Sequence, residues 1–185
     1  MAYAEVPAFV ARLREGTGVS GQALEFTILT AARSGEVLGA RWSEIDVAAR
    51  VWTVPAARMK AERDHRVPLR ARALSIVAEM RELAAVDGDN PFVFPGQRAG
   101  KGLSVMALEM VLRRAGVTDT PHGFRSAFLD WAGEETAFPP EVAEAALAHL
   151  VGDAVERAYR RGDALEKRRA LMEAWALYCT GEVVS

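Results

Sequence analysis

The residue pattern changes after Asp46, and this change constrains the fold more than any other feature of the sequence. Residues 51–54 and 66–69 are rich in β-forming residues, and a polar stretch that includes Lys60 separates them. Such a pair of segments predicts a β-hairpin with a long tip. The apolar run 92–94, inside a loop rich in Gly, Pro and Asp, is a candidate third strand. We therefore expect one small antiparallel sheet.

The remainder of the chain carries helical signals. Leu24, Ile28 and Ala31 recur at helical spacing, and Ser20 is a candidate N-cap before them. Ser34 is expected to cap a helix over 35–41, which would place Arg33 at a helix-to-helix junction where free backbone N–H groups are exposed. Further helices are predicted over residues 7–15, 72–84, 104–115, 121–133, 140–147, 153–159 and 163–178. The predicted fold class is α+β, mainly helical, in a single domain over residues 1–185.

Composition excludes several classes of protein. No apolar run approaches the roughly 20 residues that span a bilayer, and residues 1–15 lack the basic start and apolar centre of a secretion signal. A cytoplasmic protein without membrane contact is therefore expected. The single cysteine, Cys179, excludes an internal disulfide, and the three histidines are too widely spaced to form a recognisable metal-ligand cluster. We expect neither a metal nor another cofactor.

Charge points in two directions. The net charge of −2 and the pI near 6.0 argue against a nucleic-acid partner, because DNA-binding domains usually carry excess positive charge. The basic residues are nearly all arginine, with only Lys60, Lys101 and Lys167 as lysines, and the planar arginine fork suits phosphate oxygens. GC-rich codon usage accounts for much of this arginine excess. The distribution of the arginines over the folded surface decides between the two interpretations.

Two short motifs carry possible chemistry. In the segment 122–125 (HGFR), His122 and Arg125 would share one face of a helix, and together they could move a proton and stabilise charge at a phosphodiester. Alone, this spacing is common on solvated helix faces. The segment 148–152 (AHLVG), with Tyr159 ten residues after His149, is equally modest by itself, since a lone helical tyrosine usually serves packing.

Taken together, four segments resemble, in order and in spacing, the catalytic boxes of tyrosine recombinases, specifically phage-type integrases. They are 30–38 (TAARSGEVL), 122–125 (HGFR), 147–152 (LAHLVG) and 158–161 (AYRR). The resemblance covers about residues 19–180. Each box is weak, but their fixed order makes the combination specific. Segments 156–161 and 166–172 are similar to those of integrases of prophages and genomic islands.

The resemblance implies a site-specific DNA recombinase that acts in integration or excision. Tyr159 would attack the scissile phosphate, giving a 3′-phosphotyrosyl link and a free 5′-hydroxyl, so that resealing needs no ATP. Arg33 and Arg125 would hold the two non-bridging oxygens. Lys60, on the hairpin tip, would protonate the leaving 5′-oxygen; alternative candidates in the same tip are Arg58, Arg63 and His65.

The other implied roles belong to two histidines and a glutamate. His122 would handle the tyrosine proton or assist at the phosphate, and His149 would bond a non-bridging oxygen, since neutral imidazole can donate or accept. Glu36 is a residue type that the family keeps after its first arginine, and it would orient the Arg33 guanidinium without touching DNA. The implied partners are double-stranded DNA at attachment sites, other integrase protomers in a tetramer on DNA, and DNA-bending accessory proteins.

Two departures from the family limit these expectations. Members normally carry core-binding and often arm-binding domains before the catalytic domain, and we expect this chain to lack both. The chain is therefore expected to be a piece of a longer integrase or a shortened homologue, with weak DNA affinity by itself. The acidic pI is the second departure and points the same way.

The C-terminal helix, 163–179, has two interpretations. Leu171, Trp175 and Tyr178 form an apolar stripe that would either pack on its own domain or dock onto a neighbouring protomer. The alternatives to a recombinase are a topoisomerase-like nicking-closing enzyme, which would use the same residues, and a non-catalytic DNA-binding or interaction module of the same fold.

Overall fold

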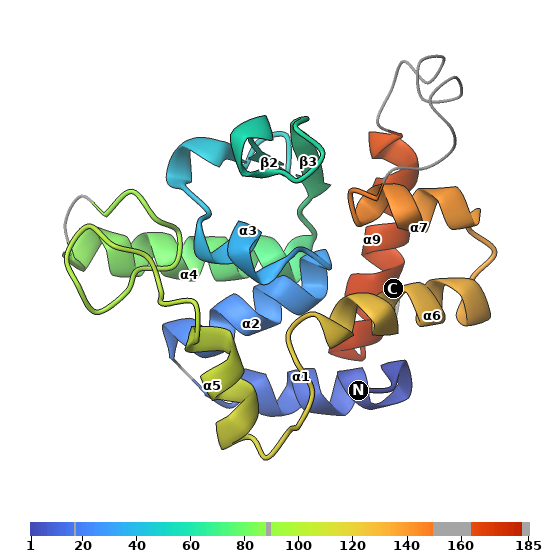
Figure 1. Ribbon diagram of the computed structural model, residues 1–185, viewed down its shortest axis with the longest axis horizontal. Helices are drawn as coiled ribbons and strands as arrows, with labels where there is room; N and C mark the ends of the chain where they lie inside the picture. Colours follow the sequence, from blue (N-terminus) through green and yellow to red (C-terminus); the bar gives the residue numbers. More distant parts are fainter. Residues whose placement is uncertain (17, 88–89, 150–163, 183–185) are drawn as a thin grey trace.

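The computed structural model describes residues 1–16, 18–87, 90–149 and 164–182, and it is mainly helical with one small sheet (Figure 1). The α-helices are α1 (Val6–Arg14), α2 (Val19–Thr30), α3 (Ser34–Leu38), α4 (Ala71–Asp87), α5 (Ala107–Arg114), α6 (Gly123–Glu135), α7 (Pro140–Ala146) and α9 (Leu165–Thr180). Short 3-10 helices are η1 (Tyr3–Glu5), η2 (Trp42–Glu44) and η3 (Ala56–Arg58). This architecture confirms the predicted α+β class. The helix predicted over 153–159 lies outside the described residues.

Helix α2 forms the centre of the core. All its residues from Ala23 to Thr30 are buried, and it packs against α1, α4, α5 and α9. Figure 1 shows these elements arranged around it. A helix that is buried on every side must satisfy its charged groups internally. Glu25, only 1 % exposed, does so by accepting two hydrogen bonds of 2.8 Å from Arg72 of α4.

Helix α9 closes the core from the C-terminal side. Leu171 and Trp175 are fully buried, and the Trp175 indole N–H donates to the Ile28 carbonyl of α2 at 2.8 Å. Trp131 of α6 and Tyr178 complete an aromatic cluster around Trp175, with ring centroids 5.0 to 5.8 Å apart. The apolar stripe of the C-terminal helix therefore packs within its own domain, as one of the two interpretations expected.

The sheet has the order β1 (Ile45–Asp46), β2 (Val51–Val54) and β3 (His65–Pro68), all antiparallel. The hairpin of β2 and β3 is confirmed. The prediction of residues 92–94 as the third strand is wrong, because β1 takes that place and Phe92 forms only an isolated bridge to Arg41. Pro91 and Pro95 flank the run and lack the N–H groups that a longer ladder needs.

The two predicted serine caps are also wrong, each by a small shift. Helix α2 begins after Gly18, so Ser20 lies in its first turn, and α3 begins after Arg33, so Ser34 is its first residue. Glu36 replaces the expected serine at the start of α3, because its carboxylate accepts the Arg33 backbone N–H at 2.9 Å. Helix α3 ends at Leu38, short of the predicted residue 41, and the chain continues through Gly39 toward the bridge with Phe92.

Candidate active site

Arg33 projects from the junction between α2 and α3. Helix α2 ends where Ala31 takes a left-handed conformation, with φ of 49°, and the chain turns sharply into α3. The Glu36 carboxylate accepts a hydrogen bond from Nη1 of Arg33 at 2.8 Å as well as the backbone bond at the helix start. The Arg33 side chain is 30 % exposed while Glu36 is buried, so the carboxylate holds the guanidinium from the protein interior and leaves part of it open to solvent.

Arg125, on the first turn of α6, joins three segments that are distant in sequence. It is 3 % exposed, and its Nη1 donates to the Ala31 carbonyl at 2.5 Å. Its Nη2 donates to the Leu147 carbonyl at 2.8 Å and to Nε2 of His149 at 3.2 Å. The N–H at Nε is buried and has no acceptor among the described residues. A buried donor without a partner is costly, so this guanidinium has capacity for one further acceptor.

The surroundings of Arg125 disfavour its positive charge. Burial, with a contribution from the nearby Arg33, lowers the pKa of the Arg125 guanidinium to about 10. Glu36 and Glu144 oppose this shift only in part. Arg125 therefore remains charged at neutral pH, and an anion between the two arginines would relieve both the desolvation and the repulsion.

His149 is held in one tautomer. Its Nδ1 lies 2.5 Å from a carboxylate oxygen of Glu144, and its backbone N–H donates to the Glu144 carbonyl at 3.0 Å. An arginine can only donate, so Nε2 accepts from Arg125 and the ring proton sits on Nδ1, facing Glu144. The preceding residue, Ala148, has φ of 53°, which turns the chain at the end of α7 toward Arg125.

His65, at the start of β3, connects the hairpin to this site. Its Nε2 lies 3.1 Å from the Ala146 carbonyl at the end of α7, and because a carbonyl only accepts, Nε2 carries the proton. Burial first, then the positive charges of Arg168 and Arg125, lower the His65 pKa from 6.5 to about 4. His65 is thus neutral at physiological pH and is a poor proton donor in this setting.

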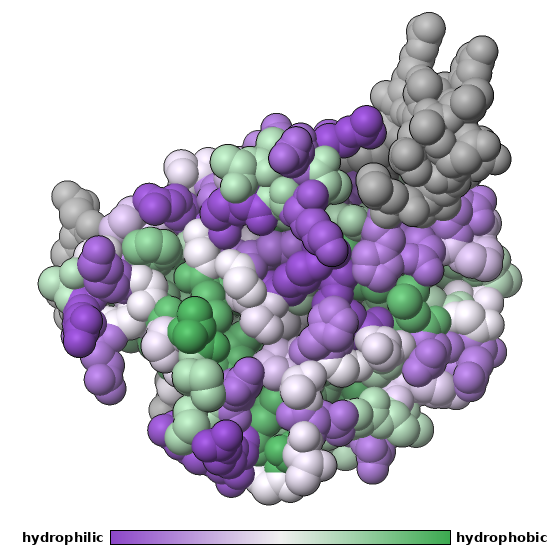
Figure 2. All heavy atoms as spheres, in the orientation of Figure 1, coloured by the Kyte–Doolittle hydropathy of each residue, from purple (hydrophilic) through white to green (hydrophobic). Residues whose placement is uncertain are grey.

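The structure brings together Arg33, Glu36, Arg125 and His149, with His65 at their edge. Lys60 is exposed on the hairpin tip and His122 is exposed just before α6. The His122 carbonyl accepts the Arg125 backbone N–H at 3.0 Å, but among the described residues neither the Lys60 nor the His122 side chain has a polar contact with the other four. Arg58 is engaged elsewhere, since it donates to the Glu36 carbonyl and to the Glu44 carboxylate. Tyr159 lies outside the described residues. Figure 2 shows hydrophilic side chains gathered between the hairpin and α7, around α3.

Sequence reasoning missed three contributors to this site. Glu144 precedes His149 by five residues, a separation that no helical periodicity marks as a pair. The carbonyl groups of Ala31 and Leu147 contact Arg125, and a backbone acceptor has no sequence signal. The Ala-Ala-Arg turn before α3 was the available hint, because an abrupt helix end exposes carbonyl groups.

The described residues contain neither a membrane-spanning helix nor a cluster of metal ligands. None of the helices there is both long and apolar enough to cross a membrane. In the same part of the chain, no group of three or more His, Cys, Asp or Glu side chains is placed to hold a metal ion.

Comparison with known proteins places these observations in a family. Residues 4–165 match the model of the phage integrase family. The chain is 43 % identical to prophage integrase IntA of Escherichia coli K12 over 152 residues, which cover 80 % of this chain and 36 % of IntA. It is 35 % identical to prophage integrase IntZ of the same strain, with 93 % of this chain and 42 % of IntZ covered.

A phage protein gives a third match. The chain is 31 % identical to the integrase of enterobacteria phage P4, with 93 % of this chain and 43 % of that protein covered. The chain therefore spans less than half the length of these three relatives. The family match covers most of the chain and contains all four arginine, glutamate and histidine side chains that the structure brings together. The chain belongs to the phage integrase family.

Proposed function

We propose that this chain is the catalytic part of a site-specific DNA recombinase, which cleaves and rejoins DNA strands through a covalent 3′-phosphotyrosyl intermediate. The observation that carries the proposal is the buried Arg125, held beside Arg33 with one N–H that no described residue accepts. A phosphodiester fits this environment because its two non-bridging oxygens require charged donors that are fixed in advance. Double-stranded DNA is the proposed substrate.

In the proposed reaction the phenolic oxygen of Tyr159 attacks the scissile phosphorus, and the bond from phosphorus to the 5′-oxygen breaks. The tyrosine proton passes to His122, and Lys60 gives a proton to the leaving 5′-oxygen. The new phosphodiester to tyrosine keeps the energy of the broken one, so the reverse attack by a 5′-hydroxyl restores DNA without ATP or metal. The roles of Tyr159 and His122 rest on their sequence motifs, and that of Lys60 rests on its place in the tip of the hairpin.

Arg33, Arg125 and His149 enter from their contacts as well. Glu36 and the carbonyl groups of Ala31 and Leu147 fix the two guanidinium groups before substrate arrives. The entropic cost of ordering these groups therefore arises when the domain folds, and it does not add to the activation barrier of the reaction. The Glu144 carboxylate holds the His149 ring beside Arg125, and in the proposed complex His149 forms a hydrogen bond with a non-bridging phosphate oxygen.

A covalent-capture experiment tests the proposal. The chain is incubated, in chelator, with a pool of nicked duplexes whose sequence around the nick is randomised. Cleavage near the nick releases a short oligonucleotide, which prevents rejoining and traps the adduct. We expect DNA attached to the peptide that contains Tyr159, no adduct with Tyr159→Phe, and losses of about 10²- to 10³-fold with Arg33→Lys or Arg125→Lys.

The same experiment identifies the alternatives. An adduct on a different residue, or none with any duplex of the pool, contradicts the proposal and favours a binding module. If the adduct forms, plasmids with one or two copies of the captured sequence separate a recombinase from a nicking-closing enzyme. Only a recombinase requires two sites to form its product. Crosslinking on the two-site plasmid then tests the further proposal that four protomers assemble on DNA.

A further inference from the structure

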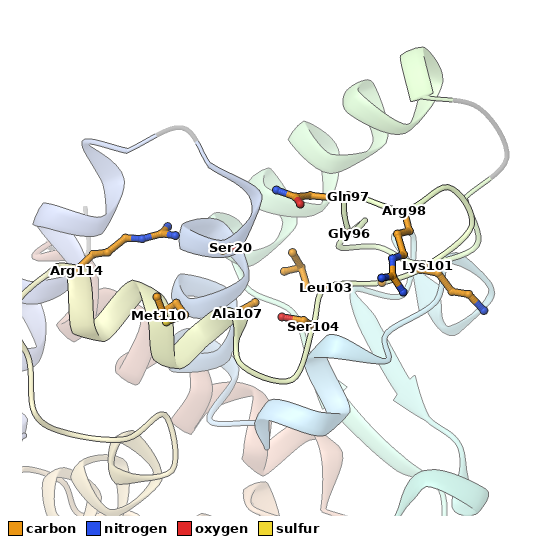
Figure 3. Close-up of a pocket in the computed structure, with 11 residues that line it drawn as sticks. Ser20, Gly96, Gln97, Arg98, Lys101, Leu103, Ser104, Ala107, Met110 and Arg114 are labelled. Carbon is orange, nitrogen blue, oxygen red and sulfur yellow. The ribbon is translucent and has the colours of Figure 1, made fainter.

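A second basic surface lies between the loop 96–104 and α5 (Figure 3). It is an open groove of about 640 Å³, and its lining includes Arg98 and Lys101 from the loop and Arg114 from the end of α5. Figure 3 shows Arg114 at one end of the groove and the two loop cations at the other, with Gln97 and Ser104 between them. The groove is therefore long and has positive charge at both ends.

The three cations are available to a ligand. Arg98, Lys101 and Arg114 are exposed, the groove lining contains no acidic residue, and within the described residues no carboxylate lies within ion-pair distance of them. By contrast, Arg33, Arg58 and Arg72 are each paired with a glutamate. Three cations without a carboxylate beside them give the groove a positive potential that the net charge of the chain does not reveal.

The loop holds its cations in a preformed shape. The Gly96 N–H donates to the Lys101 carbonyl at 2.8 Å, and the Lys101 N–H donates to the Arg98 carbonyl at 3.1 Å, which closes a tight turn. Gly100 has φ of 68°, a conformation that glycine adopts without strain. Since these bonds exist without a ligand, binding an anion here does not require the loop to be ordered first.

The groove is also fixed relative to Arg33. A Cβ atom on Gly102 would lie 2.9 Å from the Leu38 carbonyl, so the loop packs its backbone directly on the last residue of α3. Arg33 stands at the other end of this helix, whose five residues rise about 7.5 Å. The candidate active site and the groove are therefore connected through one short, rigid element.

We propose that this groove binds the sugar-phosphate backbone of the duplex, without regard to base sequence, at phosphates that flank the one held by Arg33 and Arg125. The inference rests on the proposed function for its substrate. A long groove with separated cations suits the repeated phosphates of a polymer, whereas a single small anion would need cations that converge. Gln97 and Ser104 supply neutral donors between the charged ends.

Salt dependence of DNA binding tests the groove. The variant Lys101→Ala/Arg114→Ala is compared with Arg113→Ala/Lys167→Ala, which removes the same two residue types from exposed positions outside the groove lining. Binding to a short fluorescent duplex is followed by anisotropy over a range of low salt concentrations. Each phosphate contact contributes about 0.9 to the slope of log K against log salt, so the groove variant should lose a slope of about 1.8.

The outcomes divide clearly. A slope that falls only in the groove variant supports the proposal; equal slopes for the two variants, or no measurable DNA binding by the unaltered chain, overturn it. Thermal melts confirm that both variants fold. In the covalent-capture experiment at saturating DNA, the groove variant should form as much Tyr159 adduct as the unaltered chain, and a loss there also overturns a purely backbone role. Failure of the unaltered chain to form an adduct refutes the proposed function instead.

Discussion

Protonation of His65 should destabilise the folded domain. Burial and the charges of Arg168 and Arg125 lower its pKa from 6.5 to about 4, so between these values the unfolded chain takes up a proton that the folded chain refuses. Stability therefore falls as pH falls through this window. From about pH 7 to about pH 5, the two pKa values give a loss of about 2 kcal/mol for this one residue.

The variant His65→Gln separates this effect from other titrations. Glutamine places an amide N–H near the position of Nε2, so the bond to the Ala146 carbonyl at 3.1 Å can persist, but the side chain does not titrate. At neutral pH we expect the variant to be less stable by about 1 kcal/mol, because the replacement bond is less well aligned.

Urea unfolding at the two pH values, followed by far-UV circular dichroism, measures the difference. Between the two pH values, the free energy of unfolding of the original chain should fall by about 2 kcal/mol more than that of the variant. The variant, which is the less stable protein at neutral pH, should therefore be the more stable one at the lower pH. All other titrating groups are common to both proteins and cancel. Parallel losses in the two proteins would refute the argument and show that His65 accepts a proton in the folded state.

Three further predictions concern the site and its supports. Glu144→Gln should slow adduct formation on the order of 10-fold with DNA affinity unchanged, because the bond to His149 loses its charge; an unchanged rate would exclude a role for that carboxylate. Trp175→Phe should cost about 2–3 kcal/mol in a urea titration, since it removes the indole donor and leaves a cavity, and a smaller cost would show that the site collapses. Gly102→Ala should lower the thermal midpoint by about 2–8 °C through its contact at 2.9 Å, whereas an unchanged midpoint would mean that the loop shifts freely.

Local patterns in the sequence were sufficient for most of the fold. The hairpin followed from β-formers on both sides of a polar tip, and the helices followed from apolar periodicity, because these signals act between near neighbours. The errors arose where contacts between residues far apart in the sequence, or between a cap and a side chain of the site, determine the local structure. Ser34 is a good cap by type, yet Glu36 takes the role since its carboxylate also holds Arg33. The strand predicted over 92–94 failed because β1 occupies the available edge of β2.

The sequence predicted the charged side chains of the candidate site. It did not predict the groups that hold these side chains in place. Arg33, Arg125 and His149 were recognisable because the family motifs contain them. Glu144 and the carbonyl of Ala31 were not, since their contribution depends on where α7 and α2 end in space. The sequence did not predict the basic groove either. The net charge of −2 sums all charged residues and does not show which cations lie beside a carboxylate and which do not.

The burial of α9 changes how a docking role for residues 163–179 can be proposed. Leu171 and Trp175 lie in the core, and Arg168 and Arg169 donate to backbone carbonyls of the hairpin and of the turn before it. Deleting the helix would therefore unfold the domain instead of testing assembly. If the helix contacts a neighbouring protomer, it must use positions that the core leaves exposed, such as Glu166 and Ala170. Substitutions there that alter assembly on DNA without altering stability are the condition that the docking proposal has to meet.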